Sequence, residues 1–327
     1  MLTAFTYYDP EEEGRIQQGM KDSRFFNRER EIVEEFAKEH HGAWCPVCPS
    51  CGKEDVWPIF ERLGIKYEHC KSCGTIFAAV KDEEAEAYFA QAELRELRLS
   101  EAYQTYASES RARRWEEMLD WLTFRAFRYL GSNKGLRLVN YGNRWQGFVE
   151  LIKSSSLCGS YVAKESLLAE AEEKADDSDG QTDIVLAISY LERSTKPVEF
   201  FQTAYKELKE NGLLVFSIKA GNGFDILKLG GNNPSLLPFE HNFLPSRDGI
   251  EILLERTGFE LLEYTTPGTF DLNYVKNNKS RLGKDDYFLQ YFLSHASENS
   301  LAEFQRFLQR SGMSSHAQLI ARKKVGA

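Results

Sequence analysis

The cysteine residues form the pattern with the most specific chemistry in this sequence. Five of the six cysteines lie between residues 45 and 73, and two C-x-x-C pairs are separated by 18 residues. Each pair can form a tight turn that directs two thiolates at one ion, and this spacing is typical of a zinc ribbon. Four thiolates fill the tetrahedral shell of Zn²⁺, so we predict a structural zinc site. Its predicted ligands are Cys48, Cys51, Cys70 and Cys73.

The first pair leaves the choice of one ligand open. Cys45 and Cys48 also have C-x-x-C spacing. Glycine directly after the second cysteine eases the turn, and Gly52 follows Cys51 just as a glycine follows the second pair. This favours Cys51, and Cys45 in its place is the alternative. His69 is a further alternative ligand, because it stands next to the second pair.

The best candidate for acid–base chemistry is His241, which directly follows Glu240. The unperturbed pKa of histidine lies near neutrality, so an imidazole can accept a proton from a nucleophile at physiological pH. We therefore predict that His241 is a catalytic base and that Glu240 assists it. The alternative is a structural role, in which His241 makes a hydrogen bond that orders its own loop. His316, Asp271 and Tyr274 are further candidates for the same cleft.

A fold must hold these side chains in place, and residues 183–218 predict the centre of its sheet. Residues 183–189 are a short, almost entirely apolar run, which indicates a strand buried on both faces. Residues 197–210 predict a helix, because a proline suits its first turn and apolar residues recur on one face. We expect this helix to stop at residues 211–212 and a second buried strand at 213–218. Strand, crossover helix and parallel strand together predict a βαβ unit.

The other periodic segments extend this architecture. Further strands are predicted at residues 135–140, 160–163, 259–264 and 317–321. Further helices are predicted at residues 82–99, 111–130, 148–154, 166–174 and 247–257, and from a capping box at Ser300 and Glu303 to Gly312. Residues 175–180 read as a polar connector. Open α/β sheets bind ligands at the carboxyl ends of their strands, which here means near Ser189 and residues 219–222.

Together these elements predict an α/β fold with a Rossmann-like sheet, helices on both of its faces, a small N-terminal zinc ribbon and a helical linker. We divide the chain into an N-terminal helical extension, a zinc ribbon, a helical linker or lid, and a Rossmann-like domain. The corresponding residues are 1–43, 44–80, 81–131 and 132–327.

The composition narrows the classes of partner. The formal net charge of the 327 residues is −9, which argues against a general nucleic-acid-binding protein, because such proteins normally present a basic face. No apolar run approaches the roughly 18–20 residues of a membrane span, and residues 1–15 lack the apolar core of a signal peptide. We therefore expect a soluble cytoplasmic protein that does not bind membranes.

The order of these elements resembles that of class I methyltransferases that use S-adenosylmethionine. The resemblance is greatest to bacterial members with an N-terminal zinc ribbon that act on sugars and surface polysaccharides. It spans roughly residues 44 to 324 and depends on the order and spacing of several local matches. These are residues 183–186, 197–218, 238–241, 257–259, 267–271 and 314–316, and they include the family's "EH…GF" passage.

The resemblance also implies where the cofactor would bind, at a glycine loop after the first strand of the sheet. The family's pattern is roughly D-x-G-x-G-x-G, and here only Gly142 of its glycines is retained, while Arg144 and Gln146 replace the other two. The acid that holds the ribose in the family falls on Lys164, with Glu165 one position later. The implied cofactor-binding residues are Asn140, Tyr141, Gly142, Gly147, Glu165 and Ser189.

The resemblance implies a methyltransferase that transfers a methyl group from S-adenosylmethionine to a small carbohydrate or a nucleotide-linked sugar. The alternative is a catalytically inactive, methyltransferase-like scaffold or regulatory protein, because the glycine loop and the ribose acid depart from the family pattern. Little chain is left before residue 183 for the family's third strand. A homodimer or another protein partner is left open.

Overall fold

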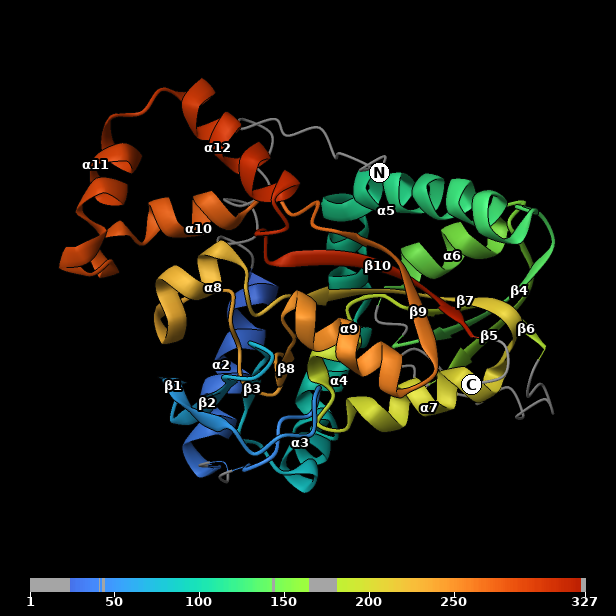
Figure 1. Ribbon diagram of the computed structural model, residues 1–327, viewed down its shortest axis with the longest axis horizontal. Coiled ribbons are helices and arrows are strands. Elements are labelled where there is room, and N and C mark those ends of the chain that lie inside the picture. The colour runs from blue at the N-terminus through green and yellow to red at the C-terminus, as the bar shows by residue number, and fades with distance from the viewer. Residues whose placement is uncertain (1–23, 41, 43–44, 143–144, 165–180, 325–327) are drawn as a thin grey trace.

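The computed structural model describes residues 24–40, 42, 45–142, 145–164 and 181–324. The predicted helix at residues 166–174 and the predicted connector at residues 175–180 lie outside the described residues, as do Glu165 and Arg144. The described part contains a large twisted sheet, a smaller sheet and a group of helices that projects to one side (Figure 1).

The large sheet has six strands in the order β5-β4-β6-β7-β10-β9. Strands β4 to β7 are mutually parallel, and β10 runs antiparallel between β7 and β9. In the described part of the chain, β5 forms one edge of this sheet. The order confirms the predicted α/β fold with a Rossmann-like sheet. The bounds are β4 (Leu136–Tyr141), β5 (Cys158–Lys164), β6 (Thr182–Ala187), β7 (Leu208–Lys219), β9 (Phe259–Thr265) and β10 (His316–Lys323).

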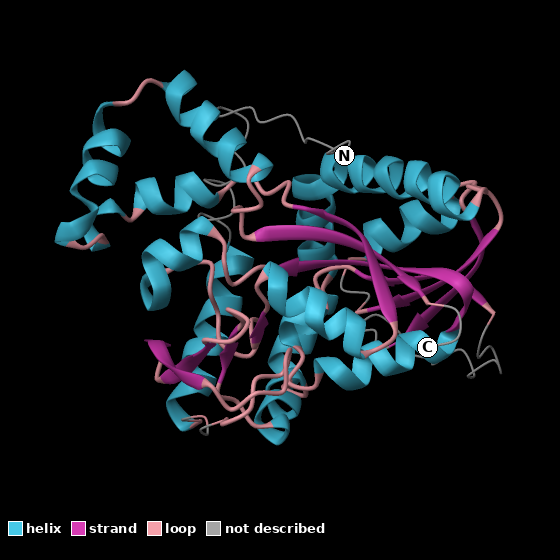
Figure 2. Cartoon of the chain, viewed as in Figure 1, coloured by secondary structure: helices cyan, strands magenta, loops and turns pink. Residues whose placement is uncertain are grey.

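Helices cover both faces of this sheet, as predicted (Figure 2). Alternate residues of the central strand point to opposite faces, so Val185 and Leu186 of β6 enter two different hydrophobic clusters. The Val185 cluster includes side chains of α7 (Pro197–Glu207) and α9 (Arg247–Arg256). The Leu186 cluster includes side chains of α5 (Glu101–Leu130) and α6 (Gln146–Ser154).

Two predicted helix ends are confirmed. Helix α5 stops at Gly131, whose φ of 73° is left-handed, and Gly258 follows α9 with a φ of 86°. However, α5 begins at Glu101, ten residues before the predicted start at residue 111, because the side chain of Ser100 caps it.

Two other boundaries differ from the prediction. Helix α7 ends at Glu207 rather than at residue 210, because the chain enters β7 at Leu208, which pairs with Thr182 of β6. The left-handed residue Asn211 therefore lies inside a strand, where the register shifts, and does not end the helix. The predicted helix at residues 82–99 is divided into α3 (Asp82–Phe89) and α4 (Ala92–Leu99).

The smaller sheet has the order β1-β2-β3-β8 and is antiparallel. Three of its strands come from the cysteine-rich segment, but β8 comes from a part of the chain more than 160 residues later. Helix α2 (Arg24–Glu39) packs against this sheet together with α3 and α4. The strands are β1 (Val56–Arg62), β2 (Ile65–Cys70), β3 (Ile76–Ala78) and β8 (Phe243–Leu244).

The projecting group of helices has its own hydrophobic cluster. Its last helix begins one turn earlier than predicted: Ser297, rather than Ser300, is its N-cap, and its hydroxyl accepts a hydrogen bond from the backbone N of Ser300 at 3.2 Å. The sequence did not predict the helices that precede it. The group consists of α8 (Phe224–Leu229), α10 (Asp271–Asn277), α11 (Tyr287–His295) and α12 (Glu298–Arg310).

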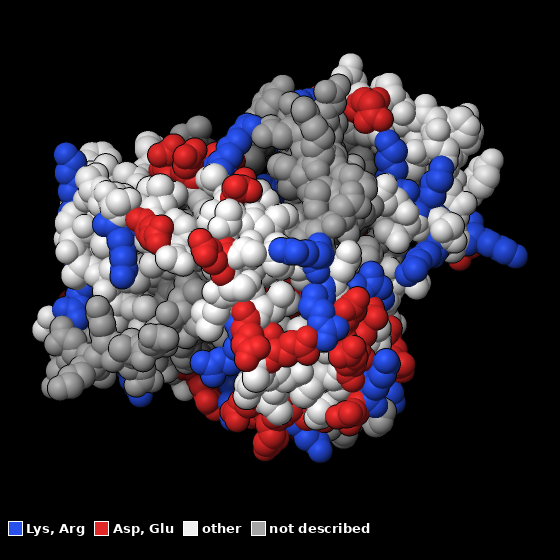
Figure 3. All heavy atoms as spheres, turned by 180° about the vertical axis from the view of Figure 1, so that it is seen from behind, with Lys and Arg blue, Asp and Glu red and all other residues white. Residues whose placement is uncertain are grey.

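Basic and acidic side chains alternate on the face shown in Figure 3, and acidic side chains gather over the region of α2 and α3. A search of the described residues finds no helix with the length and hydropathy that a membrane crossing requires.

Candidate active site and cysteine cluster

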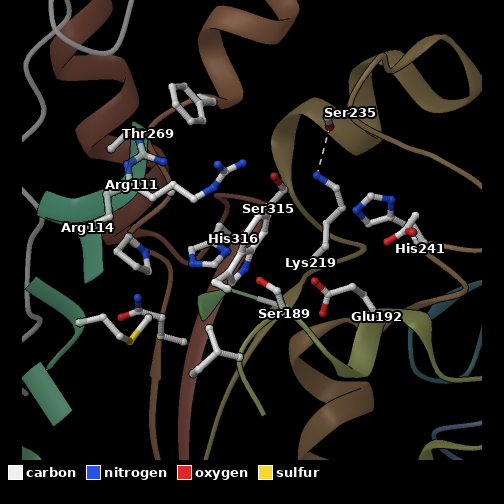
Figure 4. Close-up of a pocket in the computed structure, with 18 of the residues that line it drawn as sticks. Arg111, Arg114, Ser189, Glu192, Lys219, Ser235, His241, Thr269, Ser315 and His316 are labelled. Atoms are coloured by element: carbon white, nitrogen blue, oxygen red, sulfur yellow. Dashed lines mark hydrogen bonds between the residues drawn. The ribbon is translucent and has the colours of Figure 1, made fainter. Parts of the chain in front are cut away.

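A cavity of about 830 Å³ lies where the strands β6 and β7 end. Its volume is within the range of small-molecule sites, roughly 300–1,000 Å³. Side chains from α2, α5, the strand ends, two long loops and the start of β10 line it (Figure 4). Ser189 and Lys219 are among these side chains, so the cavity lies at the carboxyl ends of the strands, where the sequence predicts a ligand site.

The backbone is strained at two positions beside this cavity. Ser189 has a φ of 50° and Phe239 a φ of 67°, values that non-glycine residues seldom adopt. The turn at Ser189 is held by its backbone N, which donates to the hydroxyl of Ser217 at 2.9 Å. Backbone strain of this kind persists only where the surrounding structure maintains it. It is found most often at functional sites.

Glu240 lies in the cavity wall, and its carboxylate already has several partners. It forms ion pairs with Arg98 and, at 3.2 Å, with Nε of Arg193. The hydroxyl of Tyr88 also donates to it at 3.1 Å. Arg98 in turn donates to Glu29 of α2 at 2.8 Å. The carboxylate of Glu240 is therefore part of a buried network that joins α2, α3 and α4 to the loop before β8.

His241 also lines the cavity, and its environment makes it a weak base. The backbone N of Leu237 donates to Nδ1 of His241 at 3.1 Å, so this nitrogen orders the loop. Burial, with a further contribution from the positive charge of Lys219, lowers the pKa of His241 to about 3. The imidazole is therefore neutral at pH 7. The contact with Leu237 matches the structural alternative for His241, and its catalytic role stays a prediction.

The cavity also contains Glu192, which the sequence analysis did not select, and Lys219, which belongs to the ligand region predicted at residues 219–222. Glu192 lies in the short 3₁₀-helix Leu191–Arg193, its side chain is buried, and its Oε2 has no hydrogen-bond partner among the described residues. Burial raises the pKa of Glu192 to about 7. Lys219 ends β7, and its Nζ donates to the hydroxyl of Ser235 at 3.1 Å. Their position just after buried strands was the signal available in the sequence.

The four predicted zinc ligands lie together in the structure. The ligand atoms of Cys48, Cys51, Cys70 and Cys73 are all within 4.8 Å of one another. The Sγ atoms are 3.5 Å apart in the pairs Cys48–Cys73 and Cys51–Cys70. Zinc–sulfur bonds of about 2.3 Å in a tetrahedron place sulfur atoms about 3.8 Å apart, so the cluster fits a Cys₄ zinc site.

The two alternative ligands lie outside this cluster. The Sγ of Cys45 contacts the carbonyl of Val47 at 3.4 Å. The ring of His69 packs against Trp57, with the ring centroids 5.2 Å apart. Among the described residues, the group that fits a metal consists of the four predicted cysteines.

Hydrogen bonds attach the cysteine cluster to the large domain. The hydroxyl of Ser246, the N-cap of α9, donates to the carbonyl of Cys73. Arg256, at the other end of α9, donates to the carbonyl of Ser50. Strand β3 also pairs with β8, which starts two residues after His241. The cluster is thus joined directly to the wall of the cavity.

Comparison with known proteins matches the central part of the chain to one family. Residues 107–264, from near the start of α5 to β9, match a family model described as a methyltransferase domain. This stretch contains the parallel strands β4 to β7 and much of the cavity wall. Residues 107–264 are therefore similar to a methyltransferase domain.

The search of solved structures gives matches of low sequence identity. A [4+2]-cyclase, SpnF, is 15% identical over 63% of this chain and 81% of its own, with a TM-score of 0.39. An S-adenosylmethionine-dependent methyltransferase from Mesorhizobium loti is 15% identical over 63% and 98%, with a TM-score of 0.39. A further one from Archaeoglobus fulgidus is 15% identical over 63% and 94%, with a TM-score of 0.35. The search against curated proteins gives no match.

Close packing explains the two glycines among the predicted cofactor residues, Gly142 and Gly147. Gly142 has a φ of 72°, and a Cβ there would lie 2.6 Å from Cδ2 of Tyr190. A Cβ at Gly147 would lie 2.6 Å from the hydroxyl of Ser108, because α5 crosses close to α6. The ring of Tyr190 therefore occupies the space beside the predicted glycine loop.

Two other predicted cofactor residues of the domain hold neighbouring side chains. The amide of Asn140 donates to the hydroxyl of Tyr161 at 2.8 Å, and the hydroxyl of Tyr141 donates to Glu207 at 2.8 Å. Of the predicted cofactor residues, Ser189 lines the cavity. The roles of all of them in cofactor binding stay predictions.

The end of β5 is where the sequence analysis expects the residue that would hold the ribose. Lys164 stands there and forms an ion pair with the buried carboxylate of Glu207 on α7. A cation in this place does not accept hydrogen bonds from ribose hydroxyls. One part of the predicted site can therefore accommodate S-adenosylmethionine, and another part cannot. The cavity beside Ser189 has room and polar groups for a ligand, whereas the loop after β4 and the end of β5 are filled by the chain's own side chains.

Proposed function

We propose that this protein is an S-adenosylmethionine-dependent methyltransferase whose acceptor is a small carbohydrate or a nucleotide-linked sugar. The main support is the cavity of about 830 Å³ at the carboxyl ends of β6 and β7, because much of its wall comes from the residues that match a methyltransferase domain. The cavity is lined by aromatic rings and hydrogen-bonding side chains, which suits a sugar. We expect a cofactor to lie on the side of Ser189 and the acceptor on the side of Lys219.

Methyl transfer is an in-line displacement at carbon. When bound, the cofactor supplies an activated methyl group on a sulfonium. The protein must hold the acceptor nucleophile in line, exclude water and accept the proton that the nucleophile loses. Side chains of α5 and of the loop after β9 line the cavity at the strand ends. The strained turn at Ser189 fixes the floor of the cavity.

Two side chains are candidates for the proton acceptor. His241 is the predicted base, assisted by Glu240, but its lowered pKa of about 3 makes it a weak one. Glu192 has a pKa of about 7 and an Oε2 atom without a partner in the described structure, so it can accept a proton near neutral pH. We therefore add Glu192 to the candidates and favour it over His241.

Calorimetric titration of the purified protein with S-adenosylmethionine tests this proposal directly. We expect micromolar binding, and transfer of a labelled methyl group to at least one member of a panel of free and nucleotide-linked sugars. S-adenosylhomocysteine should compete with both. A folded protein that neither binds the cofactor nor transfers the methyl group would contradict the proposal.

The second candidate function is a non-catalytic scaffold or regulatory role. The ion pair of Lys164 with Glu207 and the ring of Tyr190 beside Gly142 favour it, because both occupy positions that a cofactor would need. Calorimetry separates the two functions: a Tyr190→Ala variant that gains cofactor binding absent from the wild type would support the scaffold. A homodimer or another protein partner belongs to this second proposal as well.

We further propose that Cys48, Cys51, Cys70 and Cys73 hold a structural zinc ion. Four thiolates leave no open position for a substrate, so the metal would stabilise the small sheet rather than take part in catalysis.

A further inference from the structure

A chain of hydrogen bonds leads from a fully buried carboxyl group to a lysine in the cavity. Asp225 of α8 is 0% exposed, and its Oδ2 accepts a hydrogen bond from Nδ2 of Asn233 at 2.8 Å. Oδ1 of Asn233 accepts from the hydroxyl of Ser235 at 2.8 Å. This hydroxyl accepts in turn from Nζ of Lys219 at 3.1 Å, the contact that is dashed in Figure 4. The four side chains therefore form one connected chain that ends in the cavity.

The direction of each hydrogen bond in this chain is fixed. The backbone N of Ser235 also donates to Oδ1 of Asn233 at 2.9 Å, and a backbone N–H can only donate. The oxygen of the Asn233 amide therefore faces Ser235, and its nitrogen faces Asp225. An ammonium can only donate as well, so the Ser235 hydroxyl accepts from Lys219 and gives its own proton to Asn233. The chain thus holds one N–H of Lys219 in a single orientation.

Lys219 has donors left for a ligand. Its ammonium carries three N–H groups. Among the described residues, its Nζ has one hydrogen bond, that with Ser235. Lys219 ends β7, lines the cavity and is half-buried. Two N–H groups of an ammonium that the protein already holds in place are therefore available to a bound molecule.

Titratable side chains from several elements surround this ammonium. They are Glu192 of the 3₁₀-helix, Asp225 of α8, His241 of the loop before β8 and His316 of β10. Burial is the main cause of the shifted pKa of all four, and the positive charge of Lys219 is a further cause in each. Figure 4 shows Glu192 and His241 on the same side of the cavity as Lys219. The ammonium therefore lies within electrostatic range of Glu192, the favoured proton acceptor.

A structural role alone does not account for this arrangement. A lysine that served only as the counter-charge of Asp225 would be expected to pair with it directly, because buried charges are stabilised by close partners. Here two neutral side chains lie between them, and the ammonium stands at a strand end, where α/β sheets bind ligands. The chain of hydrogen bonds thus positions the lysine in the cavity.

We propose that Lys219 is a catalytic residue whose ammonium donates hydrogen bonds to the acceptor oxygen that receives the methyl group. Asp225, Asn233 and Ser235 are its positioning residues. This role rests on the proposed methyl transfer, and it identifies the acceptor as a hydroxyl compound.

The role of the ammonium follows from the charge that develops on the acceptor. The hydroxyl proton moves to the carboxylate of Glu192. The oxygen keeps the electron pair of the broken O–H bond and bonds to the methyl carbon, while the carbon–sulfur bond of the sulfonium breaks and its electron pair stays on sulfur. Lys219 keeps its proton throughout, and its N–H groups stabilise the negative charge on the oxygen while that charge is largest.

Kinetics of variants of the full-length protein, with labelled S-adenosylmethionine and a sugar that it methylates, test the catalytic role. Lys219→Met should lower kcat by about 10²–10³-fold, because it removes donors that stabilise charge in the transition state. Ser235→Ala should lower kcat by about 10-fold and leave KM within a few-fold of the wild-type value, since the ammonium remains but is no longer held. Ser235→Thr keeps a hydroxyl and should recover most of the activity. The two Ser235 variants keep the test valid if Lys219→Met does not fold.

The surface of the protein offers a matched control pair. Nζ of Lys279 donates to the hydroxyl of Ser294 at 3.2 Å, which is the same kind of contact outside the cavity. Lys279→Met and Ser294→Ala should therefore leave kcat and KM unchanged. If they lower kcat as much as the cavity variants do, the proposal is overturned.

NMR of isotope-labelled lysine ammonium groups tests the positioning without cofactor or acceptor. Ammonium protons that are held by a hydrogen bond exchange slowly with water, so the wild type and Ser235→Thr should give a protected Lys219 signal, assigned by its loss in Lys219→Met. Ser235→Ala should speed this exchange by about 10-fold. The signal of Lys279 should be the same in all of these proteins.

Two results would overturn the proposal and leave methyl transfer intact. One is an active enzyme in which Lys219→Met keeps the wild-type kcat. The other is a Lys219 signal that exchanges equally fast in the wild type and in Ser235→Ala. A protein that methylates no acceptor would instead overturn the proposed function, and the catalytic role of Lys219 with it.

Discussion

At the scale of single residues, the carboxyl group of Glu192 shows how burial changes chemistry in this cavity. A glutamate in water is ionised at pH 7, whereas the buried Glu192 has its pKa raised to about 7. Arg193 and Lys219 stabilise its ionised form, and Glu240 opposes it. Its environment is therefore suited to exchange a proton near neutral pH.

The pH dependence of methyl transfer distinguishes Glu192 from His241. A base must be deprotonated to act, so a reaction that uses Glu192 should speed up as the pH rises to about 7 and level off above it. A reaction that uses His241, with its pKa of about 3, should show no such rise in this range. We expect kcat/KM of Glu192→Gln to fall by about 10²–10⁴-fold and its pH profile to become flat.

His241→Ala is the comparison for this experiment. If His241→Ala lowers kcat/KM by about 10²–10⁴-fold while Glu192→Gln keeps the wild-type value, the assignment of Glu192 is wrong and the sequence-based prediction for His241 is right. Thermal denaturation of both variants should accompany the kinetics, because Nδ1 of His241 also orders the loop at Leu237.

The sequence could predict these candidates only in part. Glu240-His241 could be found from its local motif, and Ser189 from its place at the end of an apolar strand. Glu192 and Lys219 also follow strands, but their burial depends on neighbours distant in sequence. The partners of Arg98 illustrate this, since Glu29 and Glu240 lie 69 and 142 residues away. A single sequence does not specify such contacts.

At the scale of secondary-structure elements, buried ion pairs join the helical linker to the cavity wall. Arg98 of α4 is 1% exposed and pairs with Glu29 of α2 and Glu240. The hydroxyl of Tyr103 at the start of α5 also donates to Glu29 at 3.1 Å. Charges buried this deeply are tolerated only because they are paired.

Arg98→Met should therefore destabilise the protein strongly, because it removes the buried cation that Glu29 and Glu240 share. We expect the free energy of unfolding to fall by about 3–5 kcal/mol, measured by chemical denaturation. Arg95→Met is the matched control on the exposed side of the same helix and should change it by less than about 0.5 kcal/mol. If the two substitutions lower the free energy of unfolding equally, the buried ion pairs do not stabilise the protein more than an exposed arginine does.

Most of the helices and strands could be predicted from local patterns in the sequence. The strands of the large sheet are apolar runs, and helix ends such as Gly131 and Gly258 carry a clear local signal. The boundary of α7 was missed because the pairing of Leu208 with Thr182 is a tertiary contact. The break between α3 and α4 was missed because the sequence there contains neither glycine nor proline.

At the scale of the whole molecule, the small sheet and the large domain share one segment of chain. Strand β8 completes the small sheet only two residues after His241, and the hydroxyl of Tyr67 on β2 donates to the carbonyl of His241 at 3.0 Å. A local reading of the cysteine motif predicts a separate ribbon. The pairing of β3 with β8 could not be predicted, because β8 is just two residues long.

Cys70→Ser should therefore affect more than the metal. We expect loss of bound zinc, from about one ion per chain to almost none, measured by plasma mass spectrometry. Thermal stability should fall as well, and the pKa and exchange of His241, followed by NMR, should change because its loop loses the β3–β8 pairing. Cys158→Ser is the control, because this cysteine lies on β5, away from the cluster. Unchanged zinc content in Cys70→Ser would refute the metal site.

The position of β10 has a consequence for how the chain reaches this architecture during synthesis. Residues 316–323 form an interior strand, and until they leave the ribosome both β7 and β9 present open edges to other nascent chains. A ribosome-bound chain that ends before residue 316 would also lack His316 and Gln318, which line the cavity. Chaperones that shield strand edges should therefore be needed late in translation rather than early.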